Sequence, residues 1–408
     1  MPVICGRVFM DGILTNACLI IENGKIVGVK KSVEGSKKDY GNTVIFPAAI
    51  DIHVHFREPG FEYKEDFFTG SRAAAMAGVT CVMDMPNNDP PVISQRIFAE
   101  KARKIRYKAC VDYGLYMGIK GRVEKCDDCI GYKVFLSGDN EIFCSMEELK
   151  EVMKKLGDGK PLAIHAEVKE CIKRGGATNL REHERNRGKK CEIEAIKKIV
   201  EMSKETKAKI HICHVTTPDS IKLLKGRVSF GVTLHHLLFS YKSKFLKEAM
   251  GKVNPPLRSE EERAELYRKF IKGELPILES DHAPHTLEEK SDFETAPSGM
   301  PGVDATMPLM FRMVKKGEID LRLLHRVMCL NPAKLFGVNK GIFERGKDAD
   351  FIVIDFGVIR QLKALSKCGW SCYEGMEAIY PKHVYLRGEK IVDDYEFIGD
   401  AGMGRMIS

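Results

Sequence analysis

The chain has 408 residues, of which 44% are hydrophobic and 30% charged, with a formal net charge of +8. This is the composition of an ordinary soluble globular protein. No apolar run approaches the ~20 residues that span a bilayer, and the first residues lack a charged-then-apolar leader. Acidic and basic residues interleave along the helical stretches, so we expect no membrane and no nucleic-acid partner. The modest positive charge is compatible with a small anionic substrate.

The thirteen cysteines are scattered through apolar stretches and show no disulfide-like framework. In a chain of this length that usage predicts reduced thiols and a cytoplasmic protein. Cys126 and Cys129 form one CxxC, but no second pair stands at zinc-ribbon spacing. We therefore interpret this CxxC as part of a surface loop.

Strand-like and helix-like segments follow one another along the chain. Residues 1–49 hold short strand-like runs separated by Gly and Asn turns. The strands predicted after them are Ile50–His55, Thr80–Met85, Tyr113–Ile119, Tyr132–Leu136, Pro161–His165, Lys209–Val215, Val228–Leu234 and Pro276–Asp281. The helices predicted between most of them are Asp66–Ala77, Ser94–Ile105, Met146–Leu156, Glu192–Ser203, Pro218–Lys225 and Glu260–Ile271.

A strand and a helix that repeat about eight times predict an α/β fold of the TIM type, a (β/α)8 barrel, over residues 50–340. The third crossover, residues 121–130, has little helical character. Residues 341–408 are again strand-like. Neither 1–49 nor 341–408 has enough strands for a sheet sandwich, so we expect both chain ends to join in one small β-sandwich domain.

Residues that bind metals recur at the ends of the predicted strands, where barrel enzymes carry their chemistry. Side chains alternate along a strand, so His53 and His55 project from one face. The other candidates at strand ends are Lys133, His165, His214 and Asp281. Each has an ordinary alternative, such as a surface lysine, a hydrogen-bonded core histidine or a helix N-cap. Together, at five strand ends, they predict a metal site.

The same alternation applies to two further predicted strands. In the sixth strand, Ile210, Ile212 and His214 are expected to share a face. In the seventh, His235 and His236 are adjacent and would point to opposite faces. We therefore interpret His235 and His236 as packing residues and leave them out of the metal site.

Longer motifs carry a family resemblance over nearly the whole chain. They are DIHVHFREPG (51–60), MPNN (85–88), GYKVF (131–135), IHAE (164–167), HICHV (211–215), NPPLR (254–258), SDHAPH (280–285), NPAK (331–334) and GKDAD (346–350). The chain resembles the metal-dependent amidohydrolases and, among them, the long-chain dihydroorotases. It departs from that pattern at Glu279, where a small residue is usual, and at Asn88, where Thr is common. Neither departure is expected to touch a proposed ligand.

The resemblance implies two zinc ions per subunit. His53, His55 and Asp281 would hold one ion, and His165 with His214 the other, while Lys133, carbamylated by carbon dioxide, would bridge them. A metal-bridging hydroxide would be the nucleophile, since metals lower the pKa of water to roughly 7. Asp281 would act as general base and acid. The implied reaction is the reversible cyclisation of N-carbamoyl-L-aspartate to L-dihydroorotate in pyrimidine biosynthesis.

A second set of residues matches the substrate-binding positions of the family. Arg57 would meet the substrate carboxylate with its guanidinium fork, alongside Asn87 and His285. Asn254 and the backbone of Pro301 and Gly302 would contact the ring amides. The segment 286–299 reads as a loop over the site and a lid.

Two other functions stay open at this point. An allantoinase or dihydropyrimidinase would share the barrel and Lys133, but its substrate lacks the carboxylate that Arg57 would bind. An inactive barrel acting as an assembly partner would have lost metal ligands, whereas all six are present. A homo-oligomer and a complex with a separate aspartate carbamoyltransferase are the partners that remain open.

Overall fold

Eight parallel strands form the centre of the computed structural model, which describes residues 2–173, 175–224, 226 and 228–408. Lys225, the last residue of one predicted helix, lies outside the described residues. Each strand pairs with the next along the chain. The strands are β5 (Ala49–Val54), β6 (Val79–Asp84), β7 (Asp112–Gly118), β8 (Gly131–Phe135), β9 (Leu162–His165), β10 (Ile210–Ile212), β11 (Ser229–Thr233) and β12 (Ile277–Glu279).

The barrel closes between its first and last strands. Val54 and His282 form a parallel bridge, and the His55 N–H donates to the His282 carbonyl over 2.7 Å. This closure brings the segment after β12 beside the end of β5, and so brings Asp281 close to the two histidines of the first strand. The predicted barrel is confirmed.

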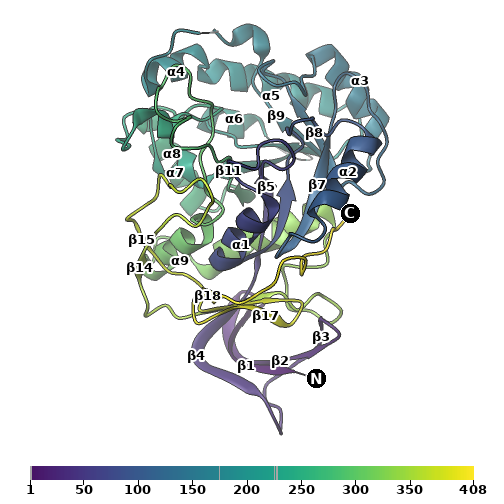
Figure 1. The fold of residues 1–408 in the computed structure, drawn as a ribbon, viewed down its shortest axis with the longest axis vertical. Coiled ribbons are helices and arrows are strands. Elements are labelled where there is room, and N and C mark those ends of the chain that lie inside the picture. The colour runs from purple at the N-terminus through teal and green to yellow at the C-terminus, as the bar shows by residue number, and fades with distance from the viewer. Residues whose placement is uncertain (1, 174, 225, 227) are drawn as a thin grey trace.

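Helices pack around the barrel (Figure 1). They are α1 (Phe67–Ala77), α2 (Gln95–Ile105), α3 (Met146–Leu156), α4 (Leu180–Asn186), α5 (Lys189–Ser203), α6 (Pro218–Leu223), α7 (Leu234–Leu238), α8 (Glu260–Ile271), α9 (Thr306–Lys316), α10 (Leu321–His325) and α11 (Asn331–Phe336). In α3, Ser145 and Glu148 cap the first turn reciprocally, while Leu149, Val152 and Met153 bury one face. The described residues between β7 and β8 include no helix, in line with the weak pattern at 121–130.

Both chain ends build a second sheet, seen at the bottom of Figure 1 in purple and yellow. Its order is β18-β17-β16-β13-β4-β1-β2-β3. The strands are β1 (Val3–Met10), β2 (Ile13–Glu22), β3 (Lys25–Lys30), β4 (Lys38–Pro47), β13 (Phe351–Ile354), β16 (His383–Leu386), β17 (Glu389–Asp393) and β18 (Glu396–Phe397). The antiparallel pairing of β4 with β13 joins the two ends. A second β domain made from both ends is thereby confirmed.

A buried ion cluster connects this sheet to the barrel. Lys340 Nζ lies 2.7 Å from an oxygen of Asp112, at the start of β7, and 2.6 Å from one of Asp350. Arg387 pairs with the other oxygen of Asp112, which also accepts the Arg405 N–H. Burial opposes the charge of Asp112, but Lys340 and Arg387 outweigh it and hold the pKa of Asp112 below its usual value.

The expectation of uniformly reduced cysteines is wrong for two pairs. Cys5 and Cys18 face each other across β1 and β2 and form a disulfide, and Cys171 bonds to Cys191. Strand register creates the first pair, and sequence spacing alone does not reveal it. The CxxC lies in a loop whose other residues are mostly exposed, as predicted, but the side chains of Cys126 and Cys129 are both buried.

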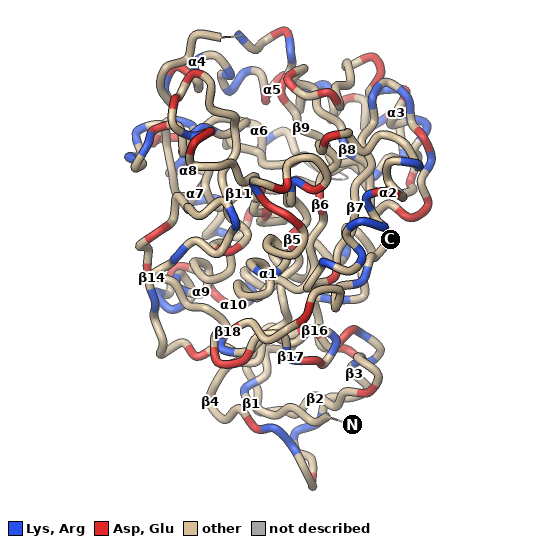
Figure 2. The backbone as a smooth tube through the Cα atoms, in the orientation of Figure 1, with Lys and Arg blue, Asp and Glu red and all other residues tan. Residues whose placement is uncertain are grey.

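Charges are dispersed over the fold. Figure 2 shows Lys and Arg interspersed with Asp and Glu along the outer helices. No helix within the described residues is long and apolar enough to cross a membrane.

Candidate metal centre and active site

A cavity of about 330 Å³ opens at the carboxyl ends of the barrel strands. Metal-ligand candidates line its floor and polar or charged side chains line its walls. The lining residues are His53, His55, Arg57, Asn87, Phe135, Asp139, Asn140, His165, His214, Asn254, Asp281, Ala283, Pro297, Ser298 and Gly299. The site therefore lies where the sequence predicts barrel chemistry.

His53, His55 and Asp281 converge on one point. The Nε2 atoms of both histidines lie 3.2 Å from Asp281 Oδ1, and one ligand atom from each residue falls within 4.8 Å of the others. Two imidazole nitrogens and a carboxylate oxygen form a donor set that suits zinc. These residues fit the metal that the sequence implies.

His165 and His214 line the same cavity, whereas Lys133 is not among its described lining residues. The rings of His165 and His214 lie 4.7 Å apart, and the ring of His53 lies 5.2 Å from that of His214. Lys133 on β8 is fully buried. Its Nζ donates to Cys213 Sγ over 3.0 Å. The structure thus brings all six predicted ligands together, although their coordination stays a prediction.

Backbone conformation, rather than strand alternation, aims His214 at the cavity. Ile210 and Ile212 belong to the large cluster that also contains Ile196 of α5, whereas Cys213 belongs to the inner cluster of the barrel. The expectation that His214 shares a face with Ile210 and Ile212 along the strand is therefore wrong. β10 ends at Ile212, and His214 has a φ of 38°.

The same left-handed conformation recurs at other site residues. Asp281 has a φ of 46° and Arg57 a φ of 63°. Non-glycine residues rarely adopt such angles, and each costs of order 1–3 kcal/mol. Three strained residues around one cavity indicate that the fold holds these side chains in place for function.

Electrostatics couple the ligand candidates. Burial opposes the charge of Asp281, but His53 and a hydrogen bond from His55 outweigh it and hold the pKa of Asp281 well below its usual value. Burial likewise opposes protonation of His53, yet Asp281 raises the pKa of His53 to about 10. Burial lowers the pKa of His55 to about 3. Asp281 and His53 thus stabilise each other's charged form.

Outer residues support these ligands, and sequence reasoning missed them. Glu167 accepts from His165 Nε2 over 2.7 Å and pairs with Arg187 over 2.6 Å. Glu279 Oε1 lies 3.4 Å from His53 Nδ1. The expectation that Glu279 touches no proposed ligand is therefore wrong. The contact joins β12 to β5 across the barrel closure, which local sequence does not show.

Arg57 lines the cavity and contacts His285 behind it. Arg57 Nε donates to the Pro284 carbonyl, and its Nη2 lies 3.0 Å from His285 Nε2. Burial lowers the pKa of Arg57 to about 10, so the guanidinium stays charged at neutral pH. Lys64, which the sequence did not single out, lies with its Nζ 3.2 Å from His285 Nδ1. Lys64 also pairs with Glu289 over 2.7 Å, and neither Lys64 nor His285 is among the described lining residues, so a carboxylate entering the cavity would meet the Arg57 guanidinium.

Asn87 and Asn254 both line the cavity. Asn87 Oδ1 lies 2.7 Å from His55 Nδ1, so its amide orients a metal-ligand candidate. Asn254 Nδ2 donates to Asp139, and its Oδ1 lies 3.0 Å from His183 Nε2.

Pro301 and Gly302 are buried and are not among the described residues that line the cavity. The Gly302 N–H donates to His282 Nδ1. The loop instead contributes Pro297, Ser298 and Gly299. Lys290 Nζ donates to the Pro297 and Lys252 carbonyls and so ties this loop to the segment at Lys252.

The seventh strand does not carry His235 and His236. Thr233 caps α7, which contains both histidines, and both are buried. The opposite-face argument from strand alternation is therefore wrong. His236 bonds to the Thr233 hydroxyl and the Pro255 carbonyl. Neither ring nitrogen of His235 has a hydrogen-bond partner among the described residues. Neither histidine lines the cavity.

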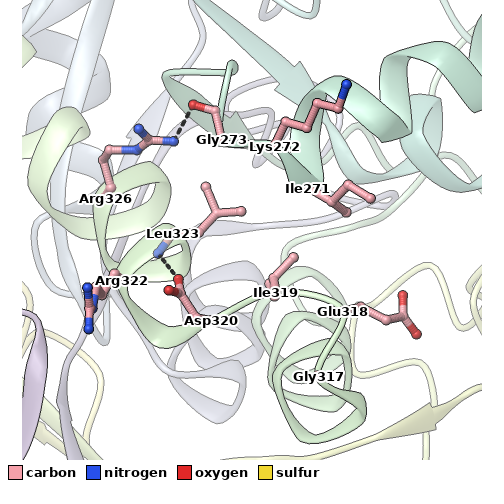
Figure 3. A pocket seen from close by; sticks show the side chains of 10 residues that line it. All are labelled: Ile271, Lys272, Gly273, Gly317, Glu318, Ile319, Asp320, Arg322, Leu323 and Arg326. Atoms are coloured by element: carbon pink, nitrogen blue, oxygen red, sulfur yellow. Dashed lines mark hydrogen bonds between the residues drawn. The ribbon is translucent and has the colours of Figure 1, made fainter.

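A larger cavity of about 590 Å³ lies between the end of α8, the end of α9 and α10. In Figure 3 its polar groups serve the local backbone: Arg326 donates to the Gly273 carbonyl, and Asp320 accepts from the Leu323 N–H. No His or Cys is found among its lining residues in the part of the chain that the structure describes. It therefore has no comparable set of metal ligands.

Comparisons with known proteins agree with the geometry. The model of the amidohydrolase family matches residues 44–390. The chain belongs to the amidohydrolase family. A dihydroorotase of Thermoplasma acidophilum is 38% identical to this amidohydrolase over 97% of the chain and 96% of the relative. A dihydroorotase of Pyrococcus furiosus is 35% identical over 97% and 93%.

Solved structures share the fold of this amidohydrolase. An L-hydantoinase from Arthrobacter aurescens superposes with a TM-score of 0.92 at 26% identity, covering 99% of this chain and 98% of the other. A dihydropyrimidinase from Brevibacillus agri gives 0.91 at 24% identity, covering 100% and 98%. The second likeness concerns the fold alone.

Proposed function

We propose that this chain is a dihydroorotase, a cyclic amidohydrolase that interconverts L-dihydroorotate and N-carbamoyl-L-aspartate. The observation that carries the proposal is the joining of two groups in one cavity. His53, His55 and Asp281 converge on its floor, and Arg57 lines the same cavity. A substrate ring that bears a carboxylate uses both groups at once. The dihydroorotase relatives support the same activity.

The ligand set and its ions form part of this proposal. His53, His55 and Asp281 would hold one zinc ion, His165 and His214 a second, and a carbamate on Lys133 would bridge them. A bound divalent ion supplies a water of low pKa and polarises a carbonyl. Two zinc ions and the carbamate rest on the family resemblance. The cytoplasmic location rests on the cysteine usage, and an oligomer or a carbamoyltransferase complex stays open.

Asp281 is the residue that moves the proton. Its Oδ1 faces both histidines, and its carboxylate lines the cavity where substrate would bind. In ring opening it takes a proton from the attacking water and returns it to the leaving ring nitrogen. In ring closure the same proton travels in reverse as water leaves.

Arg57 orients the substrate. Its Nε–H is held by the Pro284 carbonyl, and that bond fixes the plane of the guanidinium fork. A fixed fork binds a carboxylate by two parallel hydrogen bonds and sets the angle at which the ring enters. Asn254, His285 and the backbone of Pro301 and Gly302 complete the proposed contacts.

The test is turnover of L-dihydroorotate by purified protein supplied with zinc. We expect ring opening at neutral to alkaline pH and ring closure of N-carbamoyl-L-aspartate at lower pH, because closure consumes a proton. Asp281→Asn is the control, and it should abolish both directions. A zinc-loaded protein that converts neither compound would overturn the proposal.

A further inference from the structure

Glu279 is a buried carboxylate that the proposed reaction does not use. It ends β12 and is fully buried. One oxygen accepts the His214 backbone N–H and lies 3.4 Å from His53 Nδ1. The other lies 3.3 Å from His211 Nε2. One side chain thus connects the last strand of the barrel to the first strand and to the segment that carries His214.

The two histidines of the first strand are each backed by an oxygen. His55 directs Nε2 at Asp281 and has Asn87 Oδ1 at its Nδ1. His53 also directs Nε2 at Asp281. Its Nδ1 is buried and has no well-aligned hydrogen bond to any described residue, and Glu279 Oε1 lies 3.4 Å from it. Glu279 therefore faces Nδ1 of His53, as Asn87 faces Nδ1 of His55.

Space for Glu279 comes from the neighbouring strand. Gly231 on β11 has no side chain, and a Cβ there would lie 2.6 Å from Glu279 Cδ. The backbone of Gly231 does not adopt a positive φ, so the requirement for glycine is one of room. The absence of a side chain at Gly231 thus leaves the space that the Glu279 carboxylate occupies.

We propose that Glu279 is a positioning residue for the metal centre. When metal is bound, Glu279 Oε1 closes the 3.4 Å gap to His53 Nδ1–H, accepts its hydrogen bond and so fixes the tautomer in which Nε2 is free to bind metal. Partners of this kind orient a ligand and raise its basicity. The inference rests on the metal site of the proposed function, and it concerns metal binding rather than the choice of substrate.

The experiment measures zinc affinity by competition with a chelator and, with cobalt as the probe, the visible spectrum of the bound ion. Glu279→Gln keeps the shape but removes the charge, and we expect affinity to fall by roughly 10–100-fold with a changed cobalt spectrum. At saturating zinc, KM for dihydroorotate should stay unchanged while kcat falls. Glu192→Gln is the matched control, because Glu192 is equally buried but lies on α5 and serves Thr216.

A second variant perturbs Glu279 without replacing it. Gly231→Ala should push the carboxylate aside and weaken zinc binding as Glu279→Gln does. Adding Glu279→Asp to Gly231→Ala shortens the acid and should restore part of the affinity, a non-additive result. The comparison measures a gain of zinc affinity in the double variant over Gly231→Ala. It therefore stays informative if Glu279→Gln folds poorly.

Three results would overturn the inference. Wild-type zinc affinity and cobalt spectrum in Glu279→Gln would remove any positioning role. Loss of one whole equivalent of metal would make Glu279 a ligand, since its oxygen, His53 and Cys213 also fall within 4.8 Å of one another. A wild-type protein that binds no metal would overturn it as well. A wild type that binds zinc without converting dihydroorotate would fail only the proposed function.

Discussion

Lys133 Nζ donates to Cys213 Sγ over 3.0 Å in the interior of the barrel, and no carboxylate forms an ion pair with this lysine among the described residues. A buried ammonium without an anionic partner is costly. Reaction with carbon dioxide would replace that cation by an anion facing His53, His165 and His214, and so suits a site built for cations.

Lys133→Ala should therefore remove the bridge between the two proposed ions. We expect activity to fall by more than the roughly 10–100-fold that supporting residues cost. Added short-chain carboxylic acids should restore part of it, as measured by dihydroorotate turnover. Undiminished activity in Lys133→Ala would contradict the role of the carbamate.

Arg57→Met should weaken substrate binding without loss of metal. Hydrogen bonds to charged groups contribute about 1.5–3 kcal/mol, so KM for dihydroorotate should rise roughly 10–100-fold. Bound zinc, measured by atomic absorption, should match wild type. Arg96→Met, an exposed arginine on α2, is the control. Loss of zinc in Arg57→Met would mean that Arg57 is structural.

Asn87→Ala distinguishes two roles for one amide. The family resemblance predicts a substrate contact, whereas the structure places Asn87 Oδ1 on His55 Nδ1. If orientation of His55 dominates, zinc affinity should fall by roughly 10–100-fold. If substrate contact dominates, KM should rise while zinc affinity, measured by chelator competition, stays at the wild-type value.

Asp112→Asn should make the protein less stable in a pH-dependent way. The pKa of Asp112 is lower in the folded chain than in the unfolded chain, so its charge stabilises the fold above about pH 4. That contribution is lost as the pH falls through the folded-state pKa. Breaking such a buried pair costs about 3–5 kcal/mol at neutral pH. Denaturant unfolding at pH 7 and pH 3 should show this difference shrinking in acid.

Local periodicity predicted the barrel and the shared face of His53 and His55. Both follow from the order of strands and helices and from the alternation of side chains, which can be read from neighbouring residues. The predicted helices end at Ile271, so α9–α11 and the π-helical turn at Arg326–Leu330 had no predicted bounds. His214 reaches the site through a left-handed backbone angle, which residue type does not reveal. Glu279 acts across the barrel closure, and the Cys5–Cys18 bond depends on strand register; both need the tertiary structure.

One signal was present in the sequence and was misread. Thr233 precedes Leu-His-His-Leu-Leu, and threonine is a favoured N-cap. The structure has a short helix there, so His235 and His236 follow helical rather than strand geometry. The metal ligands escaped this error because most of them lie on or directly after the barrel strands themselves.

L-dihydroorotate and dihydrouracil differ only in the carboxylate on the ring, so their kcat/KM ratio in the zinc-loaded protein is the most direct measurement. Because Arg57 and the metal centre share one cavity, we expect kcat/KM to be much higher for dihydroorotate than for dihydrouracil. Arg57→Met should remove most of this difference. Equal turnover of both rings, or turnover of dihydrouracil alone, would contradict a dihydroorotase and point to a hydrolase of neutral cyclic amides.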